Sequence, residues 1–207
     1  MVAVIDYDAG NTKSVLKAFR YLGQDVELTR NPDVILSADH VVLPGVGAFG
    51  DAMGRLADYG LVDVVKDVAD AGIPLLGICL GLQLFFESSE ESPGVAGLGL
   101  LKGTNVRFTE KDGFKIPQIG WNSLHIKNGG RLFDGIEEGA FVYFVHSYHA
   151  VALDEEVVKA TCSYSDVATA SVEKGNVFAC QFHPEKSGDV GLRLLRNFLG
   201  ICREAAC

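Results

Sequence analysis

The chain has 207 residues, of which 48% are hydrophobic and 22% are charged, and its formal net charge is −9. This composition is typical of a globular protein with a sizeable core, and the length favours one domain over residues 1–207. The acidic balance without a Lys/Arg cluster argues against nucleic-acid binding, and the lack of a signal-peptide pattern or a membrane-length apolar run favours a cytoplasmic location.

The first half of the chain alternates short apolar runs with amphipathic segments. The apolar runs predict buried strands at residues 2–7, 26–28, 40–43 and 73–78. Helices are expected after an N-cap at Asn11 or Thr12, after Pro32, along the apolar positions from Met53 to Val68, and after Cys79 with Leu82, Phe85 and Phe86 at helical spacing. This alternation predicts a parallel sheet with helices on both faces.

The second half of the chain is rich in strand-like runs. A polar, glycine-bearing loop is expected at residues 88–99, and strand-like runs follow at 101–108, 118–126, 141–151, 157–163 and 169–182. The last run contains Lys174-Gly175-Asn176, which favours a hairpin, and apolar residues from Val190 to Phe198 indicate a closing helix. The fold class is therefore α/β, with a mostly parallel central sheet flanked by helices and an added antiparallel section.

Residues 77–81 read Gly-Ile-Cys-Leu-Gly and join the fourth apolar run to the following helix. A small-x-nucleophile-x-small turn of this kind places its central residue at a sharp strand-to-helix corner, where the helix dipole favours a thiolate. The motif alone would fit an inert buried cysteine equally well. The five cysteines form no CxxC pair and are odd in number, which favours reduced thiols over a disulfide framework or a zinc site.

Two further segments fall where the expected strands end, which is where sites form in open parallel sheets. His183 and Glu185 are two residues apart on a segment expected to be extended, so both side chains would face one side and could serve as base and orienting carboxylate for Cys79. Residues 44–47 read Pro-Gly-Val-Gly, and the backbone N–H groups of this turn, at Gly45, Val46 and Gly47, are candidate oxyanion-hole donors beside that of Leu80.

These motifs, taken together, carry a family resemblance that runs nearly from end to end. The stretches concerned are Gly77–Gln83 with His183-Pro-Glu185, residues 6–11 (Asp-Tyr-Asp-Ala-Gly-Asn), residues 44–50 (Pro-Gly-Val-Gly-Ala-Phe-Gly), residues 119–122 (Ile-Gly-Trp-Asn), residues 146–148 (His-Ser-Tyr) and residues 182–187 (Phe-His-Pro-Glu-Lys-Ser). The chain resembles the class I (triad) glutamine amidotransferases, and among them the glutaminase subunits of imidazole glycerol phosphate synthases.

The resemblance implies a role for each motif in releasing ammonia from glutamine. Cys79 would attack the amide, His183 would carry the proton, and Glu185 would orient His183. Gln83, Glu87, His146, Ser147 and Tyr148 would bind the substrate glutamine, with Glu87 one turn beyond Gln83 on the same helix face. No cofactor or metal is expected, since His146 and His149 would face opposite sides of a strand.

The resemblance also implies a partner. The family's acceptor chemistry takes place on a (β/α)8-barrel cyclase, which typically needs about 250 residues, so the cyclase would be a separate chain in a heterodimer. Asn11, Trp121, Asn122 and Lys186 match positions that face it. A Gly45–Val46 peptide turned away from the site would leave the oxyanion hole unmade until cyclase ligand binding shifts it.

Other functions fit parts of the same pattern. Within the fold, the alternatives are the glutaminase subunit of a pyridoxal phosphate synthase and a stand-alone glutamyl hydrolase or cysteine peptidase. The Gly-Val-Gly turn at 45–47 and Gly-Trp-Asn at 120–122 argue against the first. A catalytically silent scaffold subunit is a third alternative, and it would have no reason to keep Cys79, His183 and Glu185 together.

Overall fold

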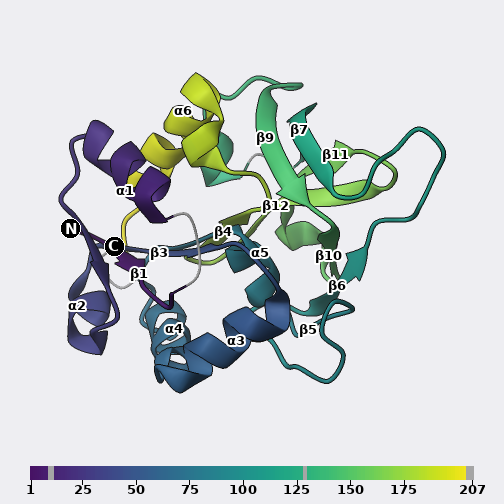
Figure 1. Ribbon diagram of the computed structural model, residues 1–207. Helices are drawn as coiled ribbons and strands as arrows, with labels where there is room; N and C mark the ends of the chain where they lie inside the picture. The colour runs from purple at the N-terminus through teal and green to yellow at the C-terminus, as the bar shows by residue number, and fades with distance from the viewer. Residues whose placement is uncertain (9–11, 128–129, 204–207) are drawn as a thin grey trace.

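The computed structural model describes residues 1–8, 12–127 and 130–203, and within this part of the chain the largest sheet has eight strands (Figure 1). Their order is β2 (Val26–Thr29), β1 (Val2–Ile5), β3 (His40–Gly45), β4 (Leu75–Cys79), β13 (Val177–Cys180), β12 (Val167–Lys174), β11 (Val158–Ser163) and β8 (His125–Ile126). The first five are parallel to their neighbours, and the remaining pairs are antiparallel. The predicted α/β class is confirmed.

Helices cover both faces of the sheet. In Figure 1, α1 (Thr12–Tyr21) and α6 (Gly188–Leu199) lie on one side, and α3 (Phe49–Asp58) and α4 (Leu61–Asp70) lie on the other. Each strand supplies both cores because its side chains alternate between the faces: Val2 and Val4 pack with α1 and α6, whereas Ala3 and Ile5 pack with α3 and α4. Two-sided burial explains why inner parallel strands such as β1 and β4 are continuous apolar runs, whereas the edge strand β2 is not.

The helix boundaries follow local signals in the sequence. At α2 (Pro32–Ser37), the Asn31 side chain accepts a hydrogen bond from the Asp33 N–H, and Pro32 occupies the first turn, where its missing N–H costs nothing. The apolar helical face expected from Met53 to Val68 is divided between α3 and α4, because the chain turns at Tyr59 and Gly60. Among the described helices, none is long and apolar enough to cross a bilayer.

The added antiparallel section forms two small sheets beside the main one. β10 (Tyr148–Ala152) pairs antiparallel with β6 (Gly103–Arg107), and β7 (Gln118–Ser123) pairs antiparallel with β9 (Phe141–His146). The short strand β5 (Ser88–Ser89) instead pairs parallel with β6. The predicted hairpin is confirmed, since β12 and β13 pair antiparallel across Gly175 and Asn176.

Two runs expected as continuous strands are interrupted. The run at 118–126 divides at Leu124, and the run at 141–151 divides at Ser147, where the chain passes from one small sheet to the other. Single turns of 3-10 helix complete the fold at η1 (Arg131–Phe133), η2 (Glu155–Val157) and η3 (Pro184–Lys186). The break at Ser147 and the turn at η3 both shape the site.

Candidate active site

Cys79 lies at a strained corner between β4 and α5 (Leu80–Leu84). Its backbone has φ 56° and ψ −105°, a conformation that non-glycine residues rarely adopt. Gly81 permits this corner, because a Cβ there would lie 2.0 Å from the carbonyl oxygen of Leu43 on β3. The predicted turn is therefore present, and the first turn of α5 packs directly against the backbone of β3. The helix is shorter than expected, since it ends at Leu84 and leaves Phe85 and Phe86 in a buried turn.

His183 and Glu185 form a buried pair beside Cys79. The imidazole Nδ1–H of His183 donates to Oε1 of Glu185 over 2.8 Å, and both side chains are almost fully buried. The expectation of an extended segment is wrong: residues 184–186 form the 3-10 turn η3, and this turn brings the carboxylate back to the ring. Because Nδ1 is engaged, Nε2 is the nitrogen left for chemistry, and it has no hydrogen-bond partner among the described residues.

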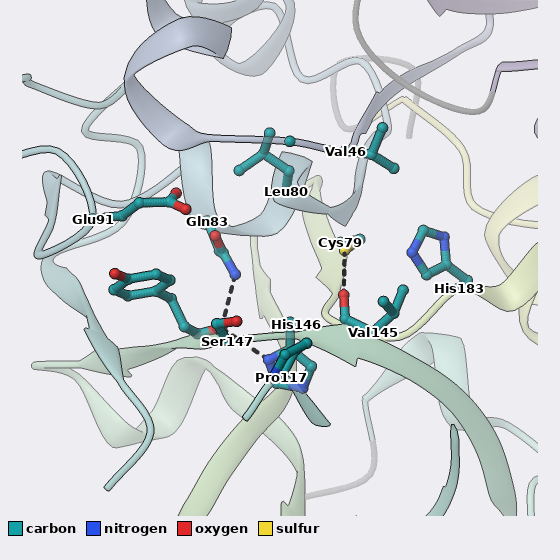
Figure 2. Close-up of a pocket in the computed structure, with 12 residues that line it drawn as sticks. Val46, Cys79, Leu80, Gln83, Glu91, Pro117, Val145, His146, Ser147 and His183 are labelled. Atoms are coloured by element: carbon teal, nitrogen blue, oxygen red, sulfur yellow. Dashed lines mark hydrogen bonds between the residues drawn. The ribbon is translucent and has the colours of Figure 1, made fainter. Parts of the chain in front are cut away.

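The electrostatics of this group favour a protonated histidine. Burial disfavours the imidazolium, but the Cys79 sulfur and the Glu185 carboxylate outweigh burial and raise the pKa of His183 to about 9. Figure 2 shows the imidazole of His183 and the sulfur of Cys79 at the same side of one pocket. The arrangement places a histidine that can take up or give back a proton beside the sulfur, as a cysteine nucleophile needs.

The pocket beside Cys79 has a volume of about 300 Å³, which suits a small polar substrate (Figure 2). It is lined by Val46, Gly47, Cys79, Leu80, Gln83, Glu91, Pro117, Val145, His146, Ser147, Tyr148 and His183. Most of the predicted site residues thus meet here, although they come from four separate segments. Gly45 and Glu87 are absent from this lining, and Glu185 lies behind His183.

The candidate oxyanion donors differ in their positions. Val46, Gly47 and Leu80 line the pocket, and the Leu80 N–H begins α5, so it has no acceptor within the helix. Gly45 instead fills a packing position, since a Cβ there would lie 2.6 Å from the Tyr7 hydroxyl. That hydroxyl donates to the Pro44 carbonyl over 2.6 Å, and burial raises the pKa of Tyr7, which keeps the phenol a donor. Tyr7 therefore anchors the end of β3, directly before Val46 and Gly47.

Gln83 occupies the pocket wall in a fixed orientation. Its Nε2 donates to the Tyr148 carbonyl over 2.9 Å and to Oε1 of Gln181 over 3.0 Å, which leaves its Oε1 for a ligand. The Tyr148 carbonyl also accepts from Nδ1 of His146 over 2.8 Å, so both of its lone pairs are used. Burial lowers the pKa of His146 to about 4, and this histidine is therefore neutral at physiological pH.

The acidic residue expected at the pocket lies outside its lining, and a different one lies within it. The prediction that Glu87 continues the line of Gln83 is wrong, because α5 ends at Leu84 and the Glu87 carboxylate turns away to accept from the Gly103 N–H over 2.9 Å. Glu91, which the sequence patterns did not single out, is the one acidic residue among the described pocket-lining residues. Its carboxylate also accepts from the Phe49 N–H over 2.8 Å, and this bond fixes its position.

His146 and His149 do not face opposite sides as expected. The strand breaks at Ser147, and both imidazoles pack against the ring of Phe108, with centroid separations of 5.0 and 4.8 Å. In the part of the chain that the structure describes, no group of three or more His, Cys, Asp and Glu residues is placed to hold a metal ion.

Among the described residues expected at a partner interface, Trp121 and Asn122 lie on β7 and Lys186 lies beside β9. Trp121 is 56% exposed and lies on β7 rather than in a turn, and Lys186 Nζ lies 5.8 Å from the ring centroid of Tyr143 on β9. Asn122 donates to the Ser163 carbonyl over 2.9 Å, which holds β7 against β11. Asn11 lies outside the described residues.

The pairing of β7 with β9 places several exposed apolar side chains on one face. Cross-strand partners point to the same side, so Trp121 and Tyr143 share one face with Ile119 and Phe141, which are 64% and 58% exposed. We call Ile119, Trp121 and Phe141 the β7–β9 apolar face. Ile119 pairs with Val145, which lines the pocket, so the face borders the active site directly.

The model of the family described as glutamine amidotransferase class-I matches residues 3–202, so the chain belongs to this family and is an enzyme with glutamine amidotransferase activity. It is similar to "Imidazole glycerol phosphate synthase subunit HisH" of Moorella thermoacetica, at 50% identity over 204 residues that cover 99% of this chain and 96% of the relative.

Further comparisons agree with this placement. The subunit of the same name from Wolinella succinogenes is 47% identical over 204 residues, which cover 97% of this chain and 100% of the relative. A crystal structure described as a glutamine amidotransferase shares the fold with a TM-score of 0.76, at 23% identity and with 97% of this chain and 98% of that chain covered.

Proposed function

We propose that this protein is the glutaminase subunit of an imidazole glycerol phosphate synthase, acting in histidine biosynthesis. It hydrolyses glutamine to glutamate and ammonia and passes the ammonia to a separate cyclase subunit with a (β/α)8-barrel fold. The observation that carries the proposal is the buried His183–Glu185 pair beside Cys79, in a pocket of about 300 Å³. The relatives' name, subunit of an imidazole glycerol phosphate synthase, supports the assembly.

In the first half of the reaction, the Cys79 thiolate attacks the side-chain carbonyl carbon of glutamine. The oxygen gains negative charge, and the N–H groups of Val46, Gly47 and Leu80 are the donors proposed to stabilise it. The imidazolium of His183 then gives its Nε2 proton to the leaving nitrogen, and the C–N bond breaks to release ammonia. A glutamyl thioester on Cys79 remains.

In the second half, water completes the cycle. Neutral His183 takes a proton from a water molecule, the hydroxide attacks the thioester carbonyl, and the C–S bond breaks to release glutamate. Thiolate and imidazolium are then restored. Glu185 keeps the Nδ1–H of His183 directed at its carboxylate throughout, so that Nε2 faces the substrate in both steps.

The α-amino group of glutamine is proposed to bind Glu91, whose carboxylate lies at the pocket. Replacing Glu91 by glutamine keeps an acceptor for the Phe49 N–H but removes the charge. We expect the KM for glutamine to rise about 10- to 100-fold with kcat changed only a few-fold, since a charged hydrogen bond is worth roughly 1.5–3 kcal/mol. Steady-state kinetics would measure this.

The neighbouring Glu90 offers a matched control for that experiment. Its carboxylate accepts from the Arg107 N–H, outside the pocket lining. Glu90→Gln is expected to leave the KM for glutamine unchanged. If Glu91→Gln behaves in the same way as Glu90→Gln, Glu91 does not bind the substrate.

The cyclase is proposed to dock on the β7–β9 apolar face, which borders the pocket. Exposed aromatic residues at the centre of such a surface commonly dominate binding energy. Trp121→Ser is therefore expected to weaken the complex with a cyclase subunit by about 2 kcal/mol, roughly 30-fold in Kd. Isothermal titration calorimetry would measure the change.

Tyr21 provides the control for this interface. It is 73% exposed and is the last residue of α1. It therefore lies near the start of β2, whereas the pocket lies at the carboxyl ends of β3 and β4. Tyr21→Ser is expected to leave the Kd unchanged. A Trp121→Ser variant that binds the cyclase as tightly as the Tyr21→Ser variant would place the interface elsewhere.

The first test of the proposed function is glutamate release by the purified chain. It would be measured alone, with a cyclase subunit, and with the cyclase and its nucleotide ligand. Low activity alone and a large rise in the full mixture would support the synthase function and an oxyanion hole that the partner completes. High activity that ignores the cyclase would indicate a stand-alone glutamyl hydrolase, and no activity in any mixture would indicate a silent scaffold.

A further inference from the structure

Gln181 lies directly after β13 and is completely buried. Its side-chain amide bridges two residues of the site: Nε2 lies 3.7 Å from the sulfur of Cys79, and Oε1 accepts from Gln83 Nε2 over 3.0 Å. Gln181 is not among the pocket-lining residues. Gln181 takes no part in the proposed reaction steps, although its amide contacts the Cys79 sulfur.

The direction of this amide is determined by a backbone group that cannot change its polarity. The carbonyl of Tyr148 can only accept, so the atom of Gln83 that faces it must be the nitrogen Nε2. Nε2 of Gln83 is a donor, so the atom of Gln181 that it meets must be Oε1. The remaining Nε2 of Gln181 therefore points its N–H at the Cys79 sulfur.

The two protonation states of Cys79 have different partners in this environment. A thiol can donate its S–H to the Val145 carbonyl, which lies 3.9 Å from the sulfur (Figure 2). A thiolate cannot donate, and it gains an N–H donor in Gln181. Hydrogen bonding to a charged form favours that form, so the amide of Gln181 acts on the thiolate and much less on the thiol.

We propose that Gln181 is a further residue of the active site, a hydrogen-bond donor that stabilises the Cys79 thiolate and is held in its donating orientation by Gln83 and the Tyr148 carbonyl. The proposal rests on the proposed function only in taking Cys79 as the nucleophile. Through Gln83, which donates to both the Tyr148 carbonyl and Gln181 Oε1, it links the wall of the substrate pocket to the charge state of the sulfur.

The test is the pH dependence of Cys79 alkylation by iodoacetamide in the full chain, followed by mass spectrometry of the peptide that contains Cys79. Gln181→Met keeps an unbranched side chain of similar length but has no N–H. We expect the midpoint of the pH profile to move upward by about one unit, because one charged hydrogen bond is lost. Above both midpoints, the limiting rate should equal or exceed that of the wild type, since a thiolate of higher pKa is the better nucleophile.

Two further variants keep the test decisive. Gln181→Glu retains an acceptor for Gln83 and the shape of the side chain while replacing the donor with oxygen, so it is expected to raise the midpoint even if the methionine variant does not fold. Ser171→Ala removes the buried hydrogen bond from Ser171 to the Ala179 carbonyl, away from Cys79, and is expected to leave the midpoint unchanged.

The outcomes separate the proposal from its alternatives. Folded Gln181 variants with the wild-type midpoint, or with a lowered limiting rate and the same midpoint, would overturn it and leave Gln181 a packing residue. Because alkylation needs neither glutamine nor a partner, a shifted midpoint in a protein without glutaminase activity would overturn the proposed function and keep this inference.

Discussion

Replacing Cys79 by alanine is expected to reduce glutamine hydrolysis to background, a loss of roughly six powers of ten. In the proposed mechanism the sulfur forms the thioester, and no other described cysteine lines the pocket. The variant should still fold, because alanine fits wherever a side chain of cysteine size fits. Glutamate release would be measured by a coupled assay, and binding to the cyclase would be measured in parallel.

Cys162 supplies the matched control. It is a free cysteine on β11 with no exposed surface, and burial raises the pKa of its thiol to about 12, so it cannot provide a thiolate near neutral pH. Cys162→Ala is expected to cost stability but to keep kcat. Glutaminase activity that survives in Cys79→Ala would exclude the thioester mechanism, whereas loss of both activity and cyclase binding would indicate a misfolded variant.

The parts of this fold that the sequence predicts are those governed by local patterns. The parallel strands are predicted because two-sided burial requires continuous apolar residues, as at Val2–Ile5. The corner at Cys79 is predicted because only a residue without a side chain fits at Gly81 against β3. In both cases the physical constraint acts on residues that are close in the sequence, so it produces a local sequence pattern that can be recognised.

Other parts depend on contacts between distant segments and leave no such spacing. Nothing local distinguishes Glu91, whose carboxylate reaches Phe49 on α3, from Glu87, which binds the Gly103 backbone instead. Gln181 stands beside the recognisable His183 but acquires its role only through Gln83 on another element. The end of α5 at Leu84 likewise reflects packing around residues 85 and 86, which helical spacing alone does not reveal.

The second large effect is expected from Glu185→Gln, which keeps the size and shape of the side chain and removes its charge. The amide still offers an oxygen to the Nδ1–H of His183, but it can also turn its NH₂ toward the ring and favour the wrong tautomer. We expect kcat/KM for glutamine to fall about 10³- to 10⁴-fold. The remaining activity would be measured against pH in the complex with the cyclase.

The alkaline limb of kcat against pH is expected to shift in a definite direction in this variant. The Cys79 sulfur and the Glu185 carboxylate overcome burial and raise the pKa of His183 to about 9, so the imidazolium proposed to protonate the leaving nitrogen persists up to that pH. Without the carboxylate, burial regains influence and the pKa of His183 falls. The charged form is then lost at a lower pH, and the alkaline limb of kcat against pH should move toward neutrality.

A control variant that loses a charge away from the pocket distinguishes the effect on His183 from the general effect of losing a partly buried ion pair. Glu173 on β12 binds the guanidinium of Arg131 over 2.8 Å, and its side chain is only 13% exposed. Glu173→Gln is therefore the same isosteric change in a partly buried ion pair that makes no contact with the pocket lining, and it is expected to leave both kcat and the alkaline limb in place. If Glu185→Gln and Glu173→Gln gave the same profile, the carboxylate of Glu185 would contribute to packing alone, and His183 would owe its charge to Cys79.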